Sequence, residues 1–361
     1  MIKYLTQEEL EKSLLISDLT LDTTHAIGIM LSQIKNAIEA KYNVNPQIIR
    51  NSPIVDPKYN YDRLYYPQTD ITKSSRYTRW ISNDKILRTQ VTSAVPQILE
   101  THKENSIYMI PGLVYRRDVI DKTHVGEPHQ LDIWKVSNNK YTRTDLLELV
   151  DVIVNTILPN CEWRYNETNH YYTKDGIEVE VLHNGKWLEI LECGLILPKL
   201  LDDCGLDSQI YGGLALGLGL DRAVMLRKNI TDIRLLRHND PRIAKQMLNL
   251  DLYKEVSNYP EVNRDISIAI LNDMNDELLG DEIRNLVQNS DIIEEIQIKS
   301  ETNYNDLPKH VSERLGMNET MKNVLVGIKM RALGTSIKKI EANYIIEQLY
   351  SKIHKGSKGY I

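Results

Sequence analysis

Three stretches of the chain combine residue types that bind phosphate, carboxylate and ammonium groups. The first is YRRDVIDKTHVGEPHQLD, residues 115–132. An arginine such as Arg116 can fork onto both a phosphate and a carboxylate, which a lysine ammonium does less well. The carboxylates of Asp118 and Asp132, with the carboxamide of Gln130, suit a substrate ammonium group. Taken alone, the segment fits a surface strand crossed by salt bridges equally well.

The second and third stretches each include a strand-like run. Gly217-Leu-Gly-Leu-Asp221-Arg222 has glycines that let a strand backbone approach a ligand closely, and it places Arg222 at a helix start, where anions collect. Tight packing of a strand on a helix, with Arg222 paired to an acid, explains the same pattern. WLEILECG, residues 187–194, places Glu189 in an apolar strand, where a buried carboxylate needs a metal or a cation. An acid on the exposed face of an amphipathic strand is the alternative.

The elements that must position these stretches follow from periodicity and turn residues. Thr6-x-x-Glu9 is a capping box and predicts a first helix. Asn184-Gly185, between strand-like flanks, predicts a tight hairpin over residues 178–193. Apolar spacing predicts helices over 25–42 and 144–158, and a strand that runs into a helix over 212–228.

The pattern restarts after a connector at residues 246–256. Beyond it we expect a strand from Asp265, a helix over 276–289, strands over 292–299 and 323–332, and a helix over 337–353. This β-α-β-β-α order predicts a small ferredoxin-like, split βαβ domain.

Composition limits the classes of function. The formal net charge is -6, so any RNA contact must rest on a local patch, and residues 299–361 are the basic part of the chain. Three cysteines without a CxxC pair argue against a zinc site or a disulfide framework and favour a reducing, cytoplasmic location. No apolar run approaches ~18 residues, so we expect no membrane span. The N-terminus lacks the apolar core of a signal peptide.

The motifs together resemble a known family. VYRRDVIDKTHVGEPHQLD resembles the motif 2 hairpin of phenylalanyl-tRNA synthetases, which are class II aminoacyl-tRNA synthetases. GGLALGLGLDRAVML and the following ITDIRLLRHNDPR resemble their motif 3 region, and RTQVTSA resembles the stretch near their motif 1. NYPEVNRDISIAI is similar to the start of the anticodon-binding domain of the single-chain, organelle-type enzymes. The likeness covers roughly residues 80–354.

The resemblance implies an α+β fold. It consists of a class II synthetase catalytic domain, with an antiparallel sheet, over residues 1–245, a linker over 246–256 and a ferredoxin-fold anticodon-binding-like domain over 257–361. The partners implied are ATP with Mg²⁺, an amino acid and tRNA, and the chain would act as a monomer or a homodimer. Such a site works by positioning and by stabilising charge around the α-phosphorus.

The resemblance also implies a role for each matching residue. The ATP site would contain Arg116 on the α-phosphate and the substrate carboxylate, Asp118 orienting Arg116, His124 near the outer phosphates, Pro128 beside adenine, Glu189 as the Mg²⁺ ligand, Gly219, and Arg222 at the γ-phosphate. The amino-acid pocket would contain Thr92, Ser93, Gln130, Asp132, His170, Tyr172, Ala215 and Gly217. The tRNA would contact Lys329, Arg331, Lys338 and Lys339.

The sequence departs from the family at the substrate ring and at adenine. His170 and Tyr172 stand where the family has paired phenylalanines, and Pro128 stands where it stacks an aromatic residue on adenine. Asp132 replaces the expected glutamate. Because polar groups reject ligands that leave them unpaired, we predict that phenylalanine is a poorer substrate here and that a polar relative is preferred. EPHQLDIW also resembles stand-alone relatives of the phenylalanyl α subunit.

Three functions follow from these observations. The leading one is amino-acid activation with ATP and transfer to tRNA. The second is a ligase on the same fold with another acid or another acceptor, and the third is a non-enzymatic sensor of amino acid or tRNA. The chain contains no phenylalanine, although roughly a dozen are expected at ordinary composition. We therefore hypothesise that the protein acts, as enzyme or sensor, when phenylalanine is limiting.

Overall fold

The computed structural model describes residues 2–102, 104–168, 170–256 and 259–358. The contacts among its residues divide the chain into two compact units. Unit 1 consists of residues Met1–Arg116, Glu127–Thr231 and Ala244–Tyr253, and unit 2 consists of Arg117–Gly126, Asp232–Ile243 and Lys254–Ile361. The boundary predicted at residue 257 lies outside the described residues, so the predicted domain limits stay a proposal.

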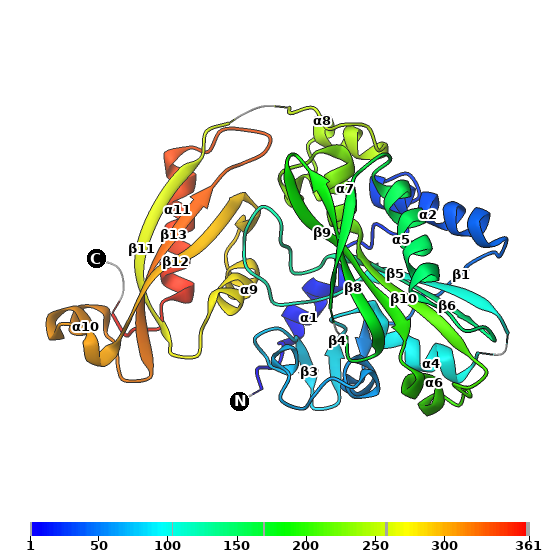
Figure 1. The fold of residues 1–361 in the computed structure, drawn as a ribbon. Helices are drawn as coiled ribbons and strands as arrows, with labels where there is room; N and C mark the ends of the chain where they lie inside the picture. The colour runs from blue at the N-terminus through cyan, green and yellow to red at the C-terminus, as the bar shows by residue number, and fades with distance from the viewer. Residues whose placement is uncertain (1, 103, 169, 257–258, 359–361) are drawn as a thin grey trace. The chain divides into compact units, whose positions relative to one another are not determined.

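Unit 1 is built on a seven-stranded sheet that is antiparallel except for one edge pair (Figure 1). Its strand order is β1 (Gln47–Ile48), β5 (Ser106–Leu113), β6 (His129–Ser137), β10 (Gly212–Gly219), β9 (Lys186–Ile196), β8 (Thr173–His183) and β7 (Trp163–Glu167). A smaller sheet has the order β2 (Ile54–Val55), β4 (Lys85–Leu87) and β3 (Trp80–Ser82).

Helices cover the sheet of unit 1 and join its strands. Among them α2, α5 and α7 contact one another, α5 contacts β9, and α7 contacts β6 and β10. The helices are α1 (Gln7–Leu14), α2 (Ala26–Tyr42), α3 (Pro57–Asn60), α4 (Val95–Glu100), α5 (Arg143–Ile157), α6 (Pro198–Asp203) and α7 (Leu220–Lys228). The short α8 (Pro241–Ala244) contains the point, after Ile243, at which the chain passes from a segment of unit 2 to one of unit 1.

Local signals in the sequence predicted several of these elements. The capping box at Thr6 is formed, with the Thr6 and Glu9 side chains each accepting the other's backbone N–H. Asn184 and Gly185 adopt φ angles of 49° and 76° and join β8 to β9. Such positive angles are those of a two-residue hairpin turn, which asparagine and glycine adopt at low cost. The strand-to-helix segment is also confirmed, as β10 followed directly by α7.

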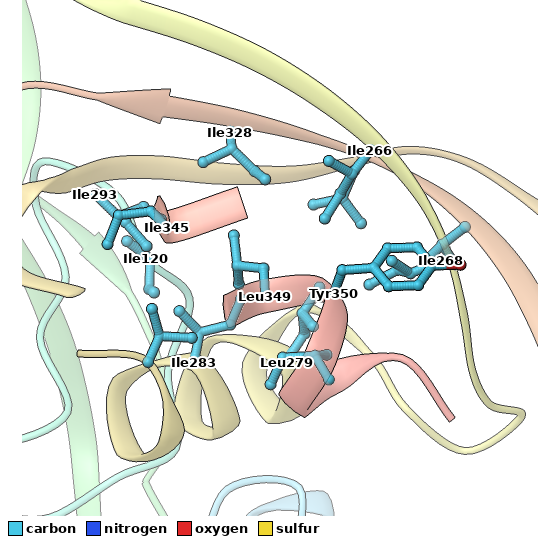
Figure 2. Close-up of a cluster of buried hydrophobic side chains, with 14 of the residues drawn as sticks. Ile120, Ile266, Ile268, Leu279, Ile283, Ile293, Ile328, Ile345, Leu349 and Tyr350 are labelled. Atoms are coloured by element: carbon cyan, nitrogen blue, oxygen red, sulfur yellow. The ribbon is translucent and has the colours of Figure 1, made fainter. Parts of the chain in front are cut away.

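Unit 2 contains a three-stranded sheet with two helices, α9 (Asp276–Leu286) and α11 (Lys339–Ile353), on one face (Figure 2). The sheet order is β11 (Val262–Leu271), β13 (Met321–Met330) and β12 (Ile293–Asn303). A third helix, α10 (Lys309–Leu315), contributes Leu315 to a separate apolar cluster with Ala269 of β11. Leu279 of α9 and Leu349 of α11 pack on Ile268 and Ile328 of the sheet. The predicted β-α-β-β-α order is present, with α10 as an additional helix before β13.

Residues 117–126 belong to unit 2, although they join β5 to β6 of unit 1 along the chain. Ile120 is 7% exposed and lies in the apolar core between α9 and α11 (Figure 2). Its carbonyl accepts a hydrogen bond from the Ile296 N–H at 3.0 Å. Arg117 forms a buried ion pair with Asp281 of α9, with 3.0 Å between Nε and Oδ2. Local periodicity could not reveal these contacts, because they join residues far apart in the sequence.

No helix in the described part of the chain is long and apolar enough to cross a membrane.

Candidate active site

The pairing of three strands brings several polar and glycine residues of the predicted amino-acid site together. In the sheet Asp132 of β6 stands opposite Gly217 of β10, which in turn stands opposite Glu192 of β9. Side chains of residues paired across neighbouring strands lie on the same face of a sheet. Because Gly217 has no side chain, no group from β10 separates the two acids. A Cβ atom at Gly217 would lie 3.5 Å from Oδ1 of Asp132.

These strands line a pocket of about 280 Å³, part of which is open to solvent. Five of its lining residues were predicted from the sequence: Asp132, His170, Tyr172, Ala215 and Gly217. Five were not: Trp134, Thr173, Glu192, Cys193 and Leu216. The alternation of β6 could have identified Trp134, which lies two residues after Asp132. Glu192 and Thr173 could not be assigned in this way, because the side they face depends on pairing between strands.

Asp132 is the buried acid of the pocket. It is 5% exposed, and its Oδ2 accepts hydrogen bonds from the Thr92 hydroxyl at 2.7 Å and the Trp134 indole N–H at 3.2 Å. Burial raises the pKa of the Asp132 carboxyl to about 6, although both hydrogen bonds oppose this shift. A carboxylate that is costly to ionise in the free protein is well placed to receive an ammonium group.

His170 and Glu192 form an ion pair at the pocket, with 2.9 Å between Nε2 and Oε2. The hydrogen bond from His170 lowers the pKa of the Glu192 carboxyl. Burial of His170 tends to lower the pKa of its imidazole, but the hydrogen bond and charge of Glu192 outweigh burial and raise it. Both shifts favour the charged form of the pair, and His170 stands where the family resemblance leads one to expect an apolar ring.

The remaining predicted residues of the amino-acid site, Thr92, Ser93 and Gln130, are not among the residues that line the pocket. Thr92 and Ser93 fall in a short 3₁₀ helix and are both buried. Thr92 holds Asp132, whereas the buried Ser93 Oγ has no hydrogen-bond partner. The side-chain oxygen Oε1 of Gln130 accepts a hydrogen bond from the Val91 backbone N–H at 3.3 Å. A buried hydroxyl without a partner is unusual in a folded protein and is a candidate contact for a ligand.

The predicted phosphate-binding residues of unit 1 come from two parts of the sheet. Arg116 follows β5, and its Nε donates to the Thr89 carbonyl at 2.8 Å. Arg222 lies in the first turn of α7, and its Nη1 donates to the Glu189 carbonyl at 3.1 Å. The carboxylate of Glu189 lies 3.9 Å from the same guanidinium, and both side chains are 45% exposed.

The glycines of β10 serve two purposes. A Cβ atom at Gly213 would lie 2.4 Å from the Lys135 carbonyl, so this glycine is required by close strand packing. A Cβ atom at Gly219 would find only Arg222 within 4.0 Å. The open space beside Gly219 lies at the N-terminus of α7, where backbone N–H groups are directed outwards. Gly213, which lies outside the Gly217–Arg222 stretch, is thus required by packing, and a contact of Gly219 with a ligand stays a prediction.

Asp118 and His124 belong to unit 2 with the rest of residues 117–126. The Asp118 side chain accepts the Val119 N–H at 2.9 Å, and its carbonyl accepts a hydrogen bond from Arg284. His124 lies 2.7 Å from Asp121. Burial opposes the shift, but hydrogen bonds from His124 and Thr123 lower the pKa of the Asp121 carboxyl to about 2. The proposed ATP contacts of Asp118 and His124 stay predictions.

Two of the four basic residues predicted to contact tRNA are paired with acids. Lys329 lies 2.6 Å from Glu295. Arg331 lies 2.6 Å from Glu294, which is fully buried, and 2.9 Å from Glu261. Lys338 and Lys339 are exposed at the start of α11. Of these four residues, Lys338 and Lys339 are therefore the more accessible to a phosphate.

A large antiparallel-dominated sheet with helices against it matches the core architecture of class II tRNA synthetases. Residues 11–247 match the family described as tRNA synthetases class II core domain (F). This match spans more than half of the chain, and the chain belongs to this family of phenylalanyl-type class II synthetase cores.

Curated relatives support the assignment. The chain is 33% identical over 201 residues to the phenylalanine–tRNA ligase alpha subunit of Haemophilus ducreyi, covering 55% of this chain and 61% of that protein. It is 31% identical over 244 residues to the corresponding subunit of Histophilus somni, covering 67% of this chain and 73% of that protein. The chain thus spans about 60% of the length of the first of these relatives.

Among solved structures, pyrrolysyl-tRNA synthetase from Desulfitobacterium hafniense matches with a TM-score of 0.49 and 14% identity. The match covers 65% of this chain and 80% of that one. This likeness is too remote to carry an argument about function.

Proposed function

We propose that the protein is a phenylalanine–tRNA-ligase-like enzyme that uses ATP and Mg²⁺ to activate an amino acid and transfers it to tRNA. The observation that carries the proposal is the buried Asp132 carboxylate in a pocket beside a glycine-bearing strand. The strand ends at Gly219, next to the Arg222–Glu189 pair. The pocket thus offers a place for an ammonium group, and the end of the strand offers a cation for phosphates.

In the proposed reaction the amino-acid carboxylate attacks the α-phosphorus of ATP. The new bond joins carboxylate oxygen to phosphorus, the bond to the bridging oxygen breaks, and pyrophosphate leaves with that electron pair. Asp132 would hold the ammonium group of the amino acid. Arg116 and Arg222 would stabilise the negative charge of the phosphates from two sides. Catalysis would rest on positioning and electrostatics, without a covalent enzyme intermediate.

Glu189 fits the proposed Mg²⁺ site. Burial, and then the charge of Glu192, raise the pKa of the Glu189 carboxyl. A cation beside this carboxyl would therefore stabilise its ionised form. Mg²⁺ is commonly held by one or two carboxylates together with substrate phosphates, so the Glu189 carboxylate can serve as its protein ligand. When bound, Mg²⁺ would neutralise phosphate charge.

The experiment is ATP–pyrophosphate exchange on the full chain with each of the twenty amino acids. Arg222→Ala should reduce exchange by roughly a hundredfold or more, equivalent to about 3 kcal/mol, because it removes a cation from the developing charge. Lys199→Ala is the matched control, since Lys199 is an exposed cation paired with Asp203 on α6. Equal activity of the Arg222→Ala variant and the control would exclude the proposed role of motif 3.

One observation favours a second candidate, a ligase that uses an acceptor other than tRNA. Lys329 and Arg331 are engaged by acids, which leaves less free positive charge in unit 2 than the sequence suggested.

We propose that unit 2 is nevertheless a ferredoxin-like, anticodon-binding-type domain, because β11 and β12 flank β13 in a split βαβ arrangement.

Transfer of the activated amino acid distinguishes these two candidates. We expect the full chain to charge tRNA and the double variant Lys338→Ala/Lys339→Ala to bind tRNA more weakly with a reduced salt dependence, since each phosphate contact adds to the slope. The control is Lys309→Ala, at an exposed cation elsewhere in unit 2. Adenylate formation without any transfer to total tRNA would support the second candidate.

A further inference from the structure

Glu192 and Thr173 line the amino-acid pocket but have no part in the chemistry proposed above. Glu192 of β9 faces Asp132 across Gly217, so two carboxylates share one face of the sheet. Asp132 is the deeper of the two, and the Glu192 side chain is 44% exposed. If Asp132 holds the ammonium group, Glu192 stands where another part of the substrate would lie.

Among the described residues, only one oxygen of the Glu192 carboxylate has a hydrogen-bond partner. Oε2 is bonded to His170, and no described residue donates to Oε1. The hydrogen bond from His170, assisted by the charge of Arg116, lowers the pKa of the Glu192 carboxyl and keeps it ionised. An ionised oxygen at a pocket is a strong acceptor for a hydroxyl or an amino group. An apolar ring edge beside this oxygen is unfavourable, because it displaces the water that solvates the carboxylate and provides no hydrogen bond in its place.

Thr173 provides an independent observation. The residue is 9% exposed and lines the same pocket, and its Oγ1 has no hydrogen-bond partner. A buried hydroxyl left unpaired is unfavourable, and such groups normally find a partner in protein, water or ligand. Its position is set by close packing, because a Cβ atom at Gly194 would lie 2.8 Å from the Thr173 Cβ.

The rest of the pocket wall is largely apolar and aromatic. Trp134 and Tyr172 lie with ring centroids 6.0 Å apart, and both line the pocket. Ala215, with a single methyl group, also lines it. The pocket thus combines an apolar wall with an ionised acceptor and an unpaired hydroxyl.

We propose that Glu192 and Thr173 are specificity-determining residues that select an aromatic amino acid with a hydroxyl or amino group on its ring and reject phenylalanine. The proposal rests on the proposed function and names the substrate class of its pocket. The donor on the ring gives its hydrogen bond to Glu192, and Thr173 Oγ1 pairs with the same polar group. Phenylalanine leaves both protein groups unpaired.

The test measures ATP–pyrophosphate exchange by the full chain with phenylalanine, tyrosine, meta-tyrosine and 4-aminophenylalanine. A site built for a hydrogen bond discriminates strongly, so kcat/KM for the best polar substrate should exceed that for phenylalanine by about a hundredfold or more. Glu192→Ala should reduce this ratio to below about tenfold. Thr173→Val, which keeps the side-chain shape, should reduce it in the same direction and guards against misfolding of the first variant. Glu180→Gln is the control, because Glu180 pairs with Arg164 on the neighbouring strand β7.

A second readout separates this proposal from the proposed function. Thermal shift with each amino acid alone requires no ATP chemistry, and bound ligand raises the melting temperature. One outcome is that exchange fails, that polar aromatic amino acids raise Tm more than phenylalanine does, and that Glu192→Ala abolishes this difference. That result would support the proposed selectivity of the pocket and contradict the proposed activation of the amino acid with ATP. If phenylalanine matches the polar substrates, or if both variants scale all substrates equally, the selectivity is overturned. Failure of every amino acid in both assays overturns both proposals.

Discussion

Asp132 of unit 1 and Asp281 of unit 2 are both buried, at 5% and 2% exposure, but they have different partners. Asp281 is bonded to the guanidinium of Arg117 at 3.0 Å. Asp132 is held by a hydroxyl and an indole N–H, and it forms no ion pair with any residue that the structure describes. Burying an acid without a cation is costly, whereas a paired acid is compensated inside the fold. The difference separates a buried acid that the described residues leave without a cation from one that is paired within the fold.

The surroundings of the two acids extend this contrast. Around Asp281, α9 approaches residues 117–126 so closely that a Cβ atom at Gly280 would lie 2.7 Å from the Asp118 carbonyl. Arg284 donates hydrogen bonds to the carbonyls of Asp118 and Val119. Around Asp132, by contrast, Gly217 leaves open space. One acid is enclosed by protein groups that satisfy it, and the other faces a pocket.

The largest effect is expected from breaking the Arg117–Asp281 pair. Arg117→Ala leaves a buried carboxylate without its partner and should destabilise unit 2 by about 3–5 kcal/mol. Urea unfolding, with limited proteolysis to identify the unit that opens, measures the loss. The control is Lys122→Ala in the same segment, where the cation is 43% exposed and its partner Glu294 also pairs with Arg331. That change should cost less than about 1 kcal/mol.

A double variant tests the physical reason for the loss. Replacing both partners, as Arg117→Leu/Asp281→Leu, removes the uncompensated charge and should restore most of the stability. If the double variant is as unstable as Arg117→Ala, the other contacts of Arg117 are what matter, and the contrast between the two aspartates fails on the unit 2 side.

The sequence predicted most of what depends on local signals. The Asn184-Gly185 turn sets the β8–β9 register as far as the Glu180–Glu189 pair, beyond which the register shifts. The alternation of β6 places Asp132 on one face, so both features follow from neighbouring residues. The five pocket residues identified in advance came mainly from the family resemblance. Their roles stay predictions, but the structure brings all five to one pocket.

What the sequence could not predict depends on contacts between distant segments. Glu192 joined the pocket only through the pairing of β9 with β10, which places it opposite Gly217. Ile120 looked like part of the motif 2 hairpin, but it packs in the core of unit 2 beside Ile283 and Ile293. The sequence predicted Lys329 and Arg331 as phosphate contacts, but in the structure both are paired with acids from another strand. No periodicity within a segment reports which distant charge or strand it will meet.

The smallest effect sharpens the comparison on the Asp132 side. Because burial raises the pKa of the Asp132 carboxyl to about 6, it is largely ionised at pH 7 and largely protonated at pH 5. Only the ionised form attracts an ammonium group, so affinity for the amino acid should fall as pH falls through 6. Over these two pH units the ionised fraction drops by roughly tenfold, or about 1.4 kcal/mol of binding free energy.

Calorimetric titration of the full chain with its best amino acid, at pH 5, 6 and 7, checks this dependence. Asp132→Asn should bind more weakly at pH 7 and show a much flatter profile, because the amide cannot titrate. His170 also titrates beside the pocket, with its pKa raised by Glu192, so a His170→Gln variant is needed to assign the change. An affinity that stays constant from pH 5 to pH 7 would mean that Asp132 does not bind the ammonium group. The unpaired acid would then need another explanation.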